Sequence, residues 1–194
     1  MAQASNIKIA LSDNENGVNM KVIFSHGKES GPWGSKITQL ANIAKAAGCR
    51  VDSIDYSNIA SPDERVTKLN TYLASELEPY ILVGSSMGGY VSLVASLSNQ
   101  PLGVFLLAPA LYMQGYQQQS YNTTLNNIEI VHGWSDDIVP VASSIKYAQQ
   151  AQCTLHLIDG DHRLNSSITQ VIALFESFLL TTKTNAQQVS VAVQ

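Results

Sequence analysis

The chain has 194 residues, a length that suits one domain with a sizeable hydrophobic core. Its formal net charge is −4 and its 11 lysines and arginines form no cluster, so it lacks the basic face with which nucleic-acid-binding proteins meet phosphates. Hydrophobic residues make up 45% of the sequence, but no apolar run approaches the roughly 18 residues of a membrane-spanning helix, so neither nucleic acid nor a membrane is an expected partner.

The N-terminal part of the chain predicts two strands and a helix. Residues 7–11 and 20–24 are strand-like, and the polar stretch 14–17 indicates a turn between them. Residues 35–47 have the spacing of a helix, which ends at Gly48. A strand followed by a helix is the first half of a βαβ unit.

A second strand and helix follow at residues 50–56 and 61–76. The helix begins with a capping box, in which Ser61 accepts a backbone hydrogen bond and Glu64 completes the pair. Pro62 suits the first turn, where a backbone N–H has no partner within the helix.

The most informative segment comes next, where a serine lies between glycines at the junction of a strand and a helix. Residues 80–84 are strand-like, residues 87–98 have helical character, and a G-x-S-x-G pattern between them places Ser86 at the apex of a sharp turn. Glycines are needed in such a turn because side chains there would collide with neighbouring backbone. The pattern predicts a nucleophile elbow, with Ser86 as the nucleophile and the Met87 backbone N–H directed at a developing oxyanion.

The second half of the chain continues to alternate between strand and helix. Residues 102–108 are apolar throughout, which indicates a strand covered on both faces, as in a parallel sheet between helices. The elements that follow are a strand at 128–132, a helix at 140–151, a strand at 153–158 and a helix at 165–180. This order predicts an α/β fold with a doubly wound, mostly parallel sheet and helices on both faces, in a single domain at 1–180.

Two segments fall outside the alternation. Residues 110–127 form a connection too long for a tight turn, and we expect them to border the substrate site as a minimal cap. Residues 181–194 are polar and show neither helical nor strand register, so we expect a disordered C-terminal tail.

Two later strand ends carry groups that can activate a serine, which alone is a poor nucleophile at neutral pH. The strand at 128–132 leads into a loop with Asp136 and Asp137, and the strand at 153–158 leads into a loop with His162. We expect His162 to act as the general base and one of the two aspartates to orient it. The order Ser, Asp, His along the chain is the order found in α/β-hydrolases.

The other histidines have structural explanations. His26 and His132 each precede a glycine at a strand end, where hydrogen bonds that stabilise a turn are the expected role. His156 lies inside a predicted strand, and we expect a core or surface histidine whose hydrogen bonds are satisfied.

The chain resembles the small bacterial esterase-like and thioesterase-like α/β-hydrolases that have little or no lid. The resemblance extends over residues 20–180 and rests on four segments: F-S-H-G at 24–27, G-S-S-M-G-G at 84–89, H-G-x-x-D-x-x-V-P at 132–140 and G-D-H at 160–162. The spacing of the third segment implies Asp136 as the triad acid, with Asp137 in reserve. The first segment implies the backbone N–H of Lys28 as the second oxyanion donor, with Glu29 as the alternative.

The resemblance implies a serine hydrolase that cleaves a carboxylic ester or thioester through an acyl-enzyme. The expected partner is a small acyl substrate, and Tyr112, Tyr116 and Trp134 are candidates for contact with it. The alternatives are an α/β-hydrolase-like protein without catalytic activity and a flavodoxin-like binder that uses 84–89 to hold phosphate. The flavodoxin-like binder leaves the polar loop residues at 136 and 162 without a role.

The cysteines bear on disulfide and metal binding, and the N-terminal residues bear on the location of the protein. Cys49 and Cys153 each open or precede a predicted strand, and we expect buried thiols rather than a disulfide. Because the sequence has no C-x-x-C pattern, we expect no metal, and no other cofactor. Residues 1–6 lack the basic start and apolar core of a signal peptide, so the expected location is the cytoplasm.

Overall fold

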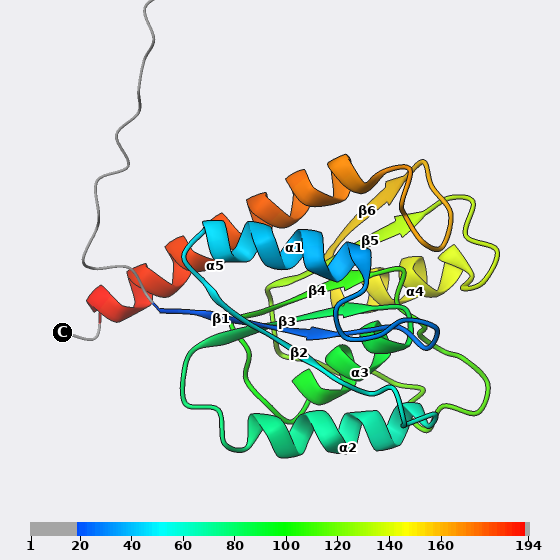
Figure 1. Ribbon diagram of the computed structural model, residues 1–194, viewed down its shortest axis with the longest axis horizontal. Coiled ribbons are helices and arrows are strands. Elements are labelled where there is room, and N and C mark those ends of the chain that lie inside the picture. The colour runs from blue at the N-terminus through cyan, green and yellow to red at the C-terminus, as the bar shows by residue number, and fades with distance from the viewer. Residues whose placement is uncertain (1–18, 193–194) are drawn as a thin grey trace, which may run out of the picture.

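A computed structural model describes residues 19–192 of the chain (Figure 1). The strand predicted at 7–11, the turn at 14–17 and the N-terminal residues 1–6 lie outside this range. Within the described part, no helix is both long and apolar enough to cross a membrane.

The described strands form one parallel sheet. They are β1 (Lys21–Ser25), β2 (Arg50–Ile54), β3 (Tyr80–Ser85), β4 (Gly103–Leu107), β5 (Ile128–Gly133) and β6 (Thr154–Ile158). Their order across the sheet is β2-β1-β3-β4-β5-β6, and every neighbouring pair is parallel. The expected α/β fold is therefore confirmed.

Helices cover both faces of the sheet. They are α1 (Ser35–Ala46), α2 (Pro62–Leu73), α3 (Met87–Ser96), α4 (Val141–Ala151) and α5 (Ile168–Ala192). Apolar side chains of α1 and α5 pack on one face, and those of α2, α3 and α4 pack on the other (Figure 1). Because side chains alternate along a strand, Val22 and Phe24 of β1 face α1 and α5 whereas Ile23 faces the opposite layer, and all three are buried.

The strand order creates a crevice at the carboxyl ends of the strands, between β1 and β3. The chain passes from β1 through α1 to β2 on one side, and then through α2 to β3 on the other side of β1. The loops that follow β1 and β3 therefore leave in opposite directions. In open α/β sheets, ligands bind at this kind of switch point, outside the carboxyl ends of the strands.

The C-terminal tail is helical where we expected disorder. Helix α5 continues to Ala192, so the prediction of a disordered tail is wrong for the described residues 181–192. Contacts between distant parts of the chain explain the difference. The Thr182 hydroxyl is buried and accepts a hydrogen bond from the Asn127 amide (2.8 Å), while the Lys183 ammonium donates to the Ala47 carbonyl (2.6 Å).

The connection at 110–127 contains no helix or strand. It lies against the layer formed by α3 and α4, with Leu111 and Tyr121 buried there. Ala110 is buried as well and the remaining side chains are partly or fully exposed, so the segment borders the crevice as a loop rather than as a separate cap domain.

Candidate active site

The turn between β3 and α3 holds Ser86 in a strained backbone conformation. Its φ is 55° and its ψ is −120°, a region that a non-glycine residue occupies only when its surroundings impose it. The Ser86 N–H donates to the Leu107 carbonyl (2.9 Å), and the Ser86 carbonyl accepts from the Ala110 N–H (3.0 Å). Strand β4 and the loop after it therefore fix the turn, and the serine side chain projects from its apex.

The glycines of the G-x-S-x-G pattern are required by close backbone contacts. A Cβ on Gly88 would lie 2.0 Å from the Ser25 carbonyl oxygen, and a Cβ on Gly84 would lie 2.2 Å from the Gly88 carbonyl oxygen. A Cβ on Gly89 would lie 2.7 Å from Pro109 Cβ. These separations leave no room for a side chain, which confirms the reason given for the glycines in the sequence.

Three polar side chains that follow separate strands meet at the carboxyl end of the sheet. His162 Nε2 lies 2.9 Å from Ser86 Oγ, and His162 Nδ1 lies 2.7 Å from Asp136 Oδ2. An ionised carboxylate only accepts hydrogen bonds, so Nδ1 carries the proton and Nε2 accepts from the serine hydroxyl. The structure thus brings together the residues proposed from the sequence as nucleophile, base and acid.

Asp136 is held as a buried carboxylate. Its Oδ1 accepts hydrogen bonds from the backbone N–H groups of Ile138 (2.9 Å) and Val139 (2.8 Å), and its side chain is fully buried. Burial opposes ionisation, but these N–H groups and His162 outweigh it and lower the pKa of Asp136. The neighbouring Asp137 is exposed, and among the described residues the carboxylate hydrogen-bonded to the imidazole is that of Asp136.

A second imidazole reaches the same carboxylate. His132 Nε2 lies 3.0 Å from Asp136 Oδ2 and 3.1 Å from the Val139 carbonyl, so this nitrogen carries the proton. The other nitrogen, Nδ1, accepts from the Ser144 hydroxyl (2.7 Å). Burial lowers the pKa of His132, which keeps the ring neutral. The sequence indicated a turn-stabilising role for His132, and only the four-residue spacing to Asp136 hinted at this contact.

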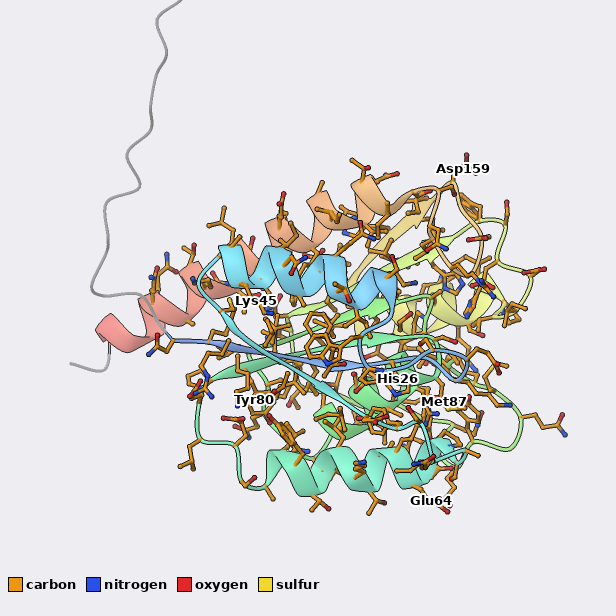
Figure 2. All side chains as sticks on the ribbon, in the orientation of Figure 1. His26, Lys45, Glu64, Tyr80, Met87 and Asp159 are labelled. Carbon is orange, nitrogen blue, oxygen red and sulfur yellow. The ribbon has the colours of Figure 1, made fainter. Side chains whose placement is uncertain are left out.

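The two backbone segments implied as oxyanion donors border the same cavity as Ser86. Met87 is the first residue of α3, where backbone N–H groups have no acceptor within the helix. Lys28 follows Gly27, which lies so near the serine that a Cβ added to it would be 3.4 Å from Ser86 Cβ. Figure 2 shows His26 and Met87 at the same end of the sheet.

The cavity in front of Ser86 has a volume of about 930 Å³. Part of its wall is apolar, formed by Met87, Ala110, Met113, Tyr116 and Val139. Charged side chains of both signs also line it: Lys28, Lys36, Arg163, Glu29, Asp137 and Asp161. The cavity therefore has apolar wall next to the serine.

Lys36 connects α1 to the loop that carries the histidine. Its ammonium group donates to the Arg163 carbonyl (2.9 Å), one residue after His162. Desolvation lowers the pKa of Lys36 to about 8, although the nearby carboxylates of Asp161 and Asp136 favour its charged form. The loop is thus fixed from the α1 side as well as through its contact with the aspartate.

The three candidate substrate contacts differ in position. Tyr116 lines the cavity, whereas Tyr112 and Trp134 do not. The Tyr112 hydroxyl donates to Gln150 of α4 (2.7 Å), and the Lys146 ammonium lies 3.9 Å from the centre of its ring, so this side chain is directed to α4. Trp134 is 58% exposed outside the cavity. Of the three candidates, the structure therefore places Tyr116 in the cavity wall and the other two outside it.

Among residues 19–192, no group of three or more histidine, cysteine, aspartate or glutamate side chains is arranged to hold a metal ion. Both cysteines are free, with Cys49 buried and Cys153 half-buried.

Comparison with known proteins agrees with this architecture. The model of an uncharacterised protein family, UPF0227, matches residues 21–181. A protein of the α/β-hydrolase superfamily from Xanthomonas campestris has a TM-score of 0.76 and 29% identity, over 83% of this chain and 98% of its own. No curated protein matches the chain.

Two further solved structures share the fold at lower identity. Est1E from Butyrivibrio proteoclasticus has a TM-score of 0.71 and 17% identity, over 87% of this chain and 90% of its own. A serine hydrolase without a lid, from Xanthomonas campestris, has a TM-score of 0.64 and 18% identity, over 84% of this chain and 81% of its own. The fold is therefore that of a small α/β-hydrolase without a separate lid.

Proposed function

We propose that this chain, which belongs to the uncharacterised protein family UPF0227, is a serine hydrolase that cleaves a carboxylic ester or thioester. Ser86 is the nucleophile, His162 the general base and Asp136 the residue that orients it. The observation that carries the proposal is the position of His162, within 2.9 Å of Ser86 Oγ and 2.7 Å of Asp136 Oδ2.

The geometry supports nucleophilic attack by Ser86 with proton transfer to His162. As Ser86 Oγ attacks the acyl carbon, its proton passes to His162 Nε2, which already accepts its hydrogen bond. Asp136 holds the ring with Nδ1 protonated and stabilises the imidazolium that forms. The backbone N–H groups of Met87 and Lys28 then stabilise the oxyanion, at about 3–4 kcal/mol for each well-placed donor.

Collapse of the tetrahedral intermediate completes acylation. The carbon–oxygen or carbon–sulfur bond to the leaving group breaks, and His162 returns its proton to the departing alcohol or thiol. Water then attacks the acyl-enzyme with the same histidine as base, which releases the acid and restores the Ser86 hydroxyl. Each step uses side chains that the fold has already brought into contact.

The same contacts argue against a phosphate-binding role for the turn at 84–89. A backbone anion cradle needs neither a serine hydrogen-bonded to an imidazole nor a buried carboxylate behind that imidazole. Here His162 connects the two groups, and Asp136 is provided with two backbone donors of its own. The absence of a separate lid over the cavity favours short or exposed acyl groups as substrates.

Replacement of the nucleophile tests the proposal. Ser86→Ala should reduce turnover of short p-nitrophenyl esters and acyl-CoA thioesters by about 10⁴-fold or more, with the thermal unfolding midpoint nearly unchanged. Ser98→Ala, at an exposed serine just beyond the end of α3, is the matched control and should retain wild-type activity. If Ser86→Ala turned over these substrates as fast as the control, the assignment would be wrong.

A further inference from the structure

Arg65, on α2, is a buried cation without a carboxylate partner. Its side chain is among the largest that are fully buried, at 2% exposure. Among residues 19–192, no aspartate or glutamate forms an ion pair with it. Burying a charge is costly unless hydrogen bonds compensate for the lost water, so its partners indicate why the chain retains it.

The guanidinium group donates to backbone carbonyls instead. Its Nε donates to the Ile59 carbonyl (2.7 Å), and Nη1 donates to the carbonyls of His26 (3.4 Å) and Gly27 (3.3 Å). Its central carbon lies 5.3 Å from the centre of the Tyr56 ring, which adds a cation–π contact. The arginine therefore attaches α2 to the loop that leaves β1 beside Ser86.

His26 donates to the same loop, in a tautomer that its partners define. The Tyr56 backbone N–H donates to His26 Nε2 (2.9 Å), so Nε2 carries no proton. The proton of the neutral ring is then on Nδ1, which donates to the Gly27 carbonyl (2.7 Å). Burial lowers the pKa of His26, and the nearby Arg65 charge lowers it further, so the ring is neutral near pH 7.

The Gly27 carbonyl thus accepts two hydrogen bonds, from an imidazole and from a guanidinium. This carbonyl belongs to the peptide group whose N–H is that of Lys28. In a trans peptide, the N–H and C=O groups point in opposite directions, so donors that hold the oxygen also fix the direction of the N–H. The Lys28 N–H itself donates to no acceptor within the described chain, and Lys28 lines the cavity with Ser86.

We propose that Arg65 and His26 are positioning residues that hold the Gly27–Lys28 peptide as the second oxyanion donor. The proposal rests on the serine hydrolase function proposed above. The two donors orient the peptide, and hydrogen bonds to its carbonyl polarise it so that its N–H becomes a stronger donor. The arrangement also selects Lys28 over Glu29, because it is the Lys28 N–H that shares a peptide group with the held carbonyl.

Arg65→Met keeps the length of the side chain and removes its charge and donors. With a p-nitrophenyl ester, we expect kcat to fall roughly 10- to 100-fold while KM changes less than about threefold, because the lost interaction acts on the transition state. Affinity for a trifluoromethyl ketone analogue, which forms a tetrahedral oxyanion, should fall by the same factor as kcat/KM. A merely structural role would not produce this parallel loss.

Lys21→Met is the matched control for loss of a buried cation. Lys21 is 7% exposed and pairs with Glu76 (2.5 Å) at the opposite end of β1. This variant should lose stability while it retains the kcat and the inhibitor affinity of the wild type. His26→Asn, which retains a donor near the Nδ1 position, should be more active than His26→Ala.

The amide resonance of Lys28 gives a readout that does not depend on turnover. In ¹⁵N-labelled protein, Arg65→Met should shift the Lys28 amide proton upfield and increase its exchange rate with solvent, whereas Lys21→Met should leave both unchanged. Should Arg65→Met fail to fold, Arg65→Lys serves instead, because its single ammonium cannot reproduce the contacts of Nε and Nη1.

The outcomes separate the two proposals. An inactive wild-type enzyme whose Lys28 amide still depends on Arg65 would overturn the hydrolase function and leave the positioning role in place. Unchanged kcat, inhibitor affinity and Lys28 resonance in the Arg65 variants would overturn the positioning role, whatever the substrate proves to be.

Discussion

At Ser86 the chain adopts a backbone conformation that its own side chain disfavours, and the neighbouring glycines make this possible. With φ at 55°, the residue lies in the left-handed region, where strain of about 1–3 kcal/mol must be balanced by its surroundings. The hydrogen bonds from β4 and the following loop supply that balance. The strain directs the hydroxyl to His162 rather than into the sheet.

Gly88→Ala should therefore be severely destabilising. The new Cβ would lie 2.0 Å from the Ser25 carbonyl oxygen, and neither backbone segment can move without disturbing the sheet. We expect a loss of more than about 3 kcal/mol in the free energy of unfolding, measured by urea denaturation, or failure to fold.

Gly31→Ala is the control for this prediction. No atom lies within 4 Å of a Cβ at Gly31, so the substitution should leave stability unchanged or raise it by up to about 1 kcal/mol. Equal changes in the free energy of unfolding in the two variants would contradict the close contact between Gly88 and the Ser25 carbonyl of β1.

Residues differ in how far the sequence predicts their place. Ser86 and His162 follow apolar runs and lie in distinctive loop patterns, so their convergence could be expected from the rule that parallel strands end at one edge. The parts played by Arg65 and His132 depend on packing between distant elements. A cation in an amphipathic helix is expected at the surface, and only the position of α2 against the loop after β1 buries Arg65.

At the scale of elements, the order of strands and helices follows from the alternation of apolar runs with helical spacing. Each strand and helix predicted from residue 20 onward is present, with ends that shift by a few residues except at α5. The end of α5 could not be predicted, because its stability beyond residue 180 comes from contacts with distant segments rather than from its own polar sequence.

Thr182→Val tests whether those contacts hold the end of α5 in place. The substitution keeps the shape of the side chain but removes the hydroxyl that accepts from Asn127 and donates to the Phe178 carbonyl (2.8 Å each). The free energy of unfolding should fall by about 1–2 kcal/mol.

Thr184→Val is the matched control. This threonine is exposed, and among residues 19–192 its hydroxyl bonds only to the Leu180 carbonyl within the helix, so the change should stay within about 0.5 kcal/mol. If the segment beyond residue 180 were disordered, both substitutions would leave the free energy of unfolding unchanged.

At the scale of the whole molecule, buried neutral histidines make stability depend on pH. Burial lowers the pKa values of His26 and His132 in the folded protein, so between those values and the ordinary value of about 6.5 the unfolded chain binds more protons. Their contribution to stability is present above about pH 6.5 and is lost as the pH falls toward the folded pKa values.

We therefore expect the free energy of unfolding to decrease from pH 7.5 to pH 5, with each histidine contributing at most about 1.4 kcal/mol per pH unit. Urea denaturation at a series of pH values measures this slope. In His132→Gln the slope should be shallower, because one titrating group is absent. Stability that stayed constant across this range in the wild type would contradict the burial of neutral imidazoles.

The central claim is that Ser86 is a nucleophile activated by His162, and covalent labelling tests it most directly. A fluorophosphonate probe, followed by peptide mass spectrometry, should modify Ser86 in the wild-type protein, and His162→Ala should react at least about 10³-fold more slowly because the base is missing. A wild-type protein that remained unlabelled at Ser86, or a His162→Ala variant labelled at the wild-type rate, would contradict the account.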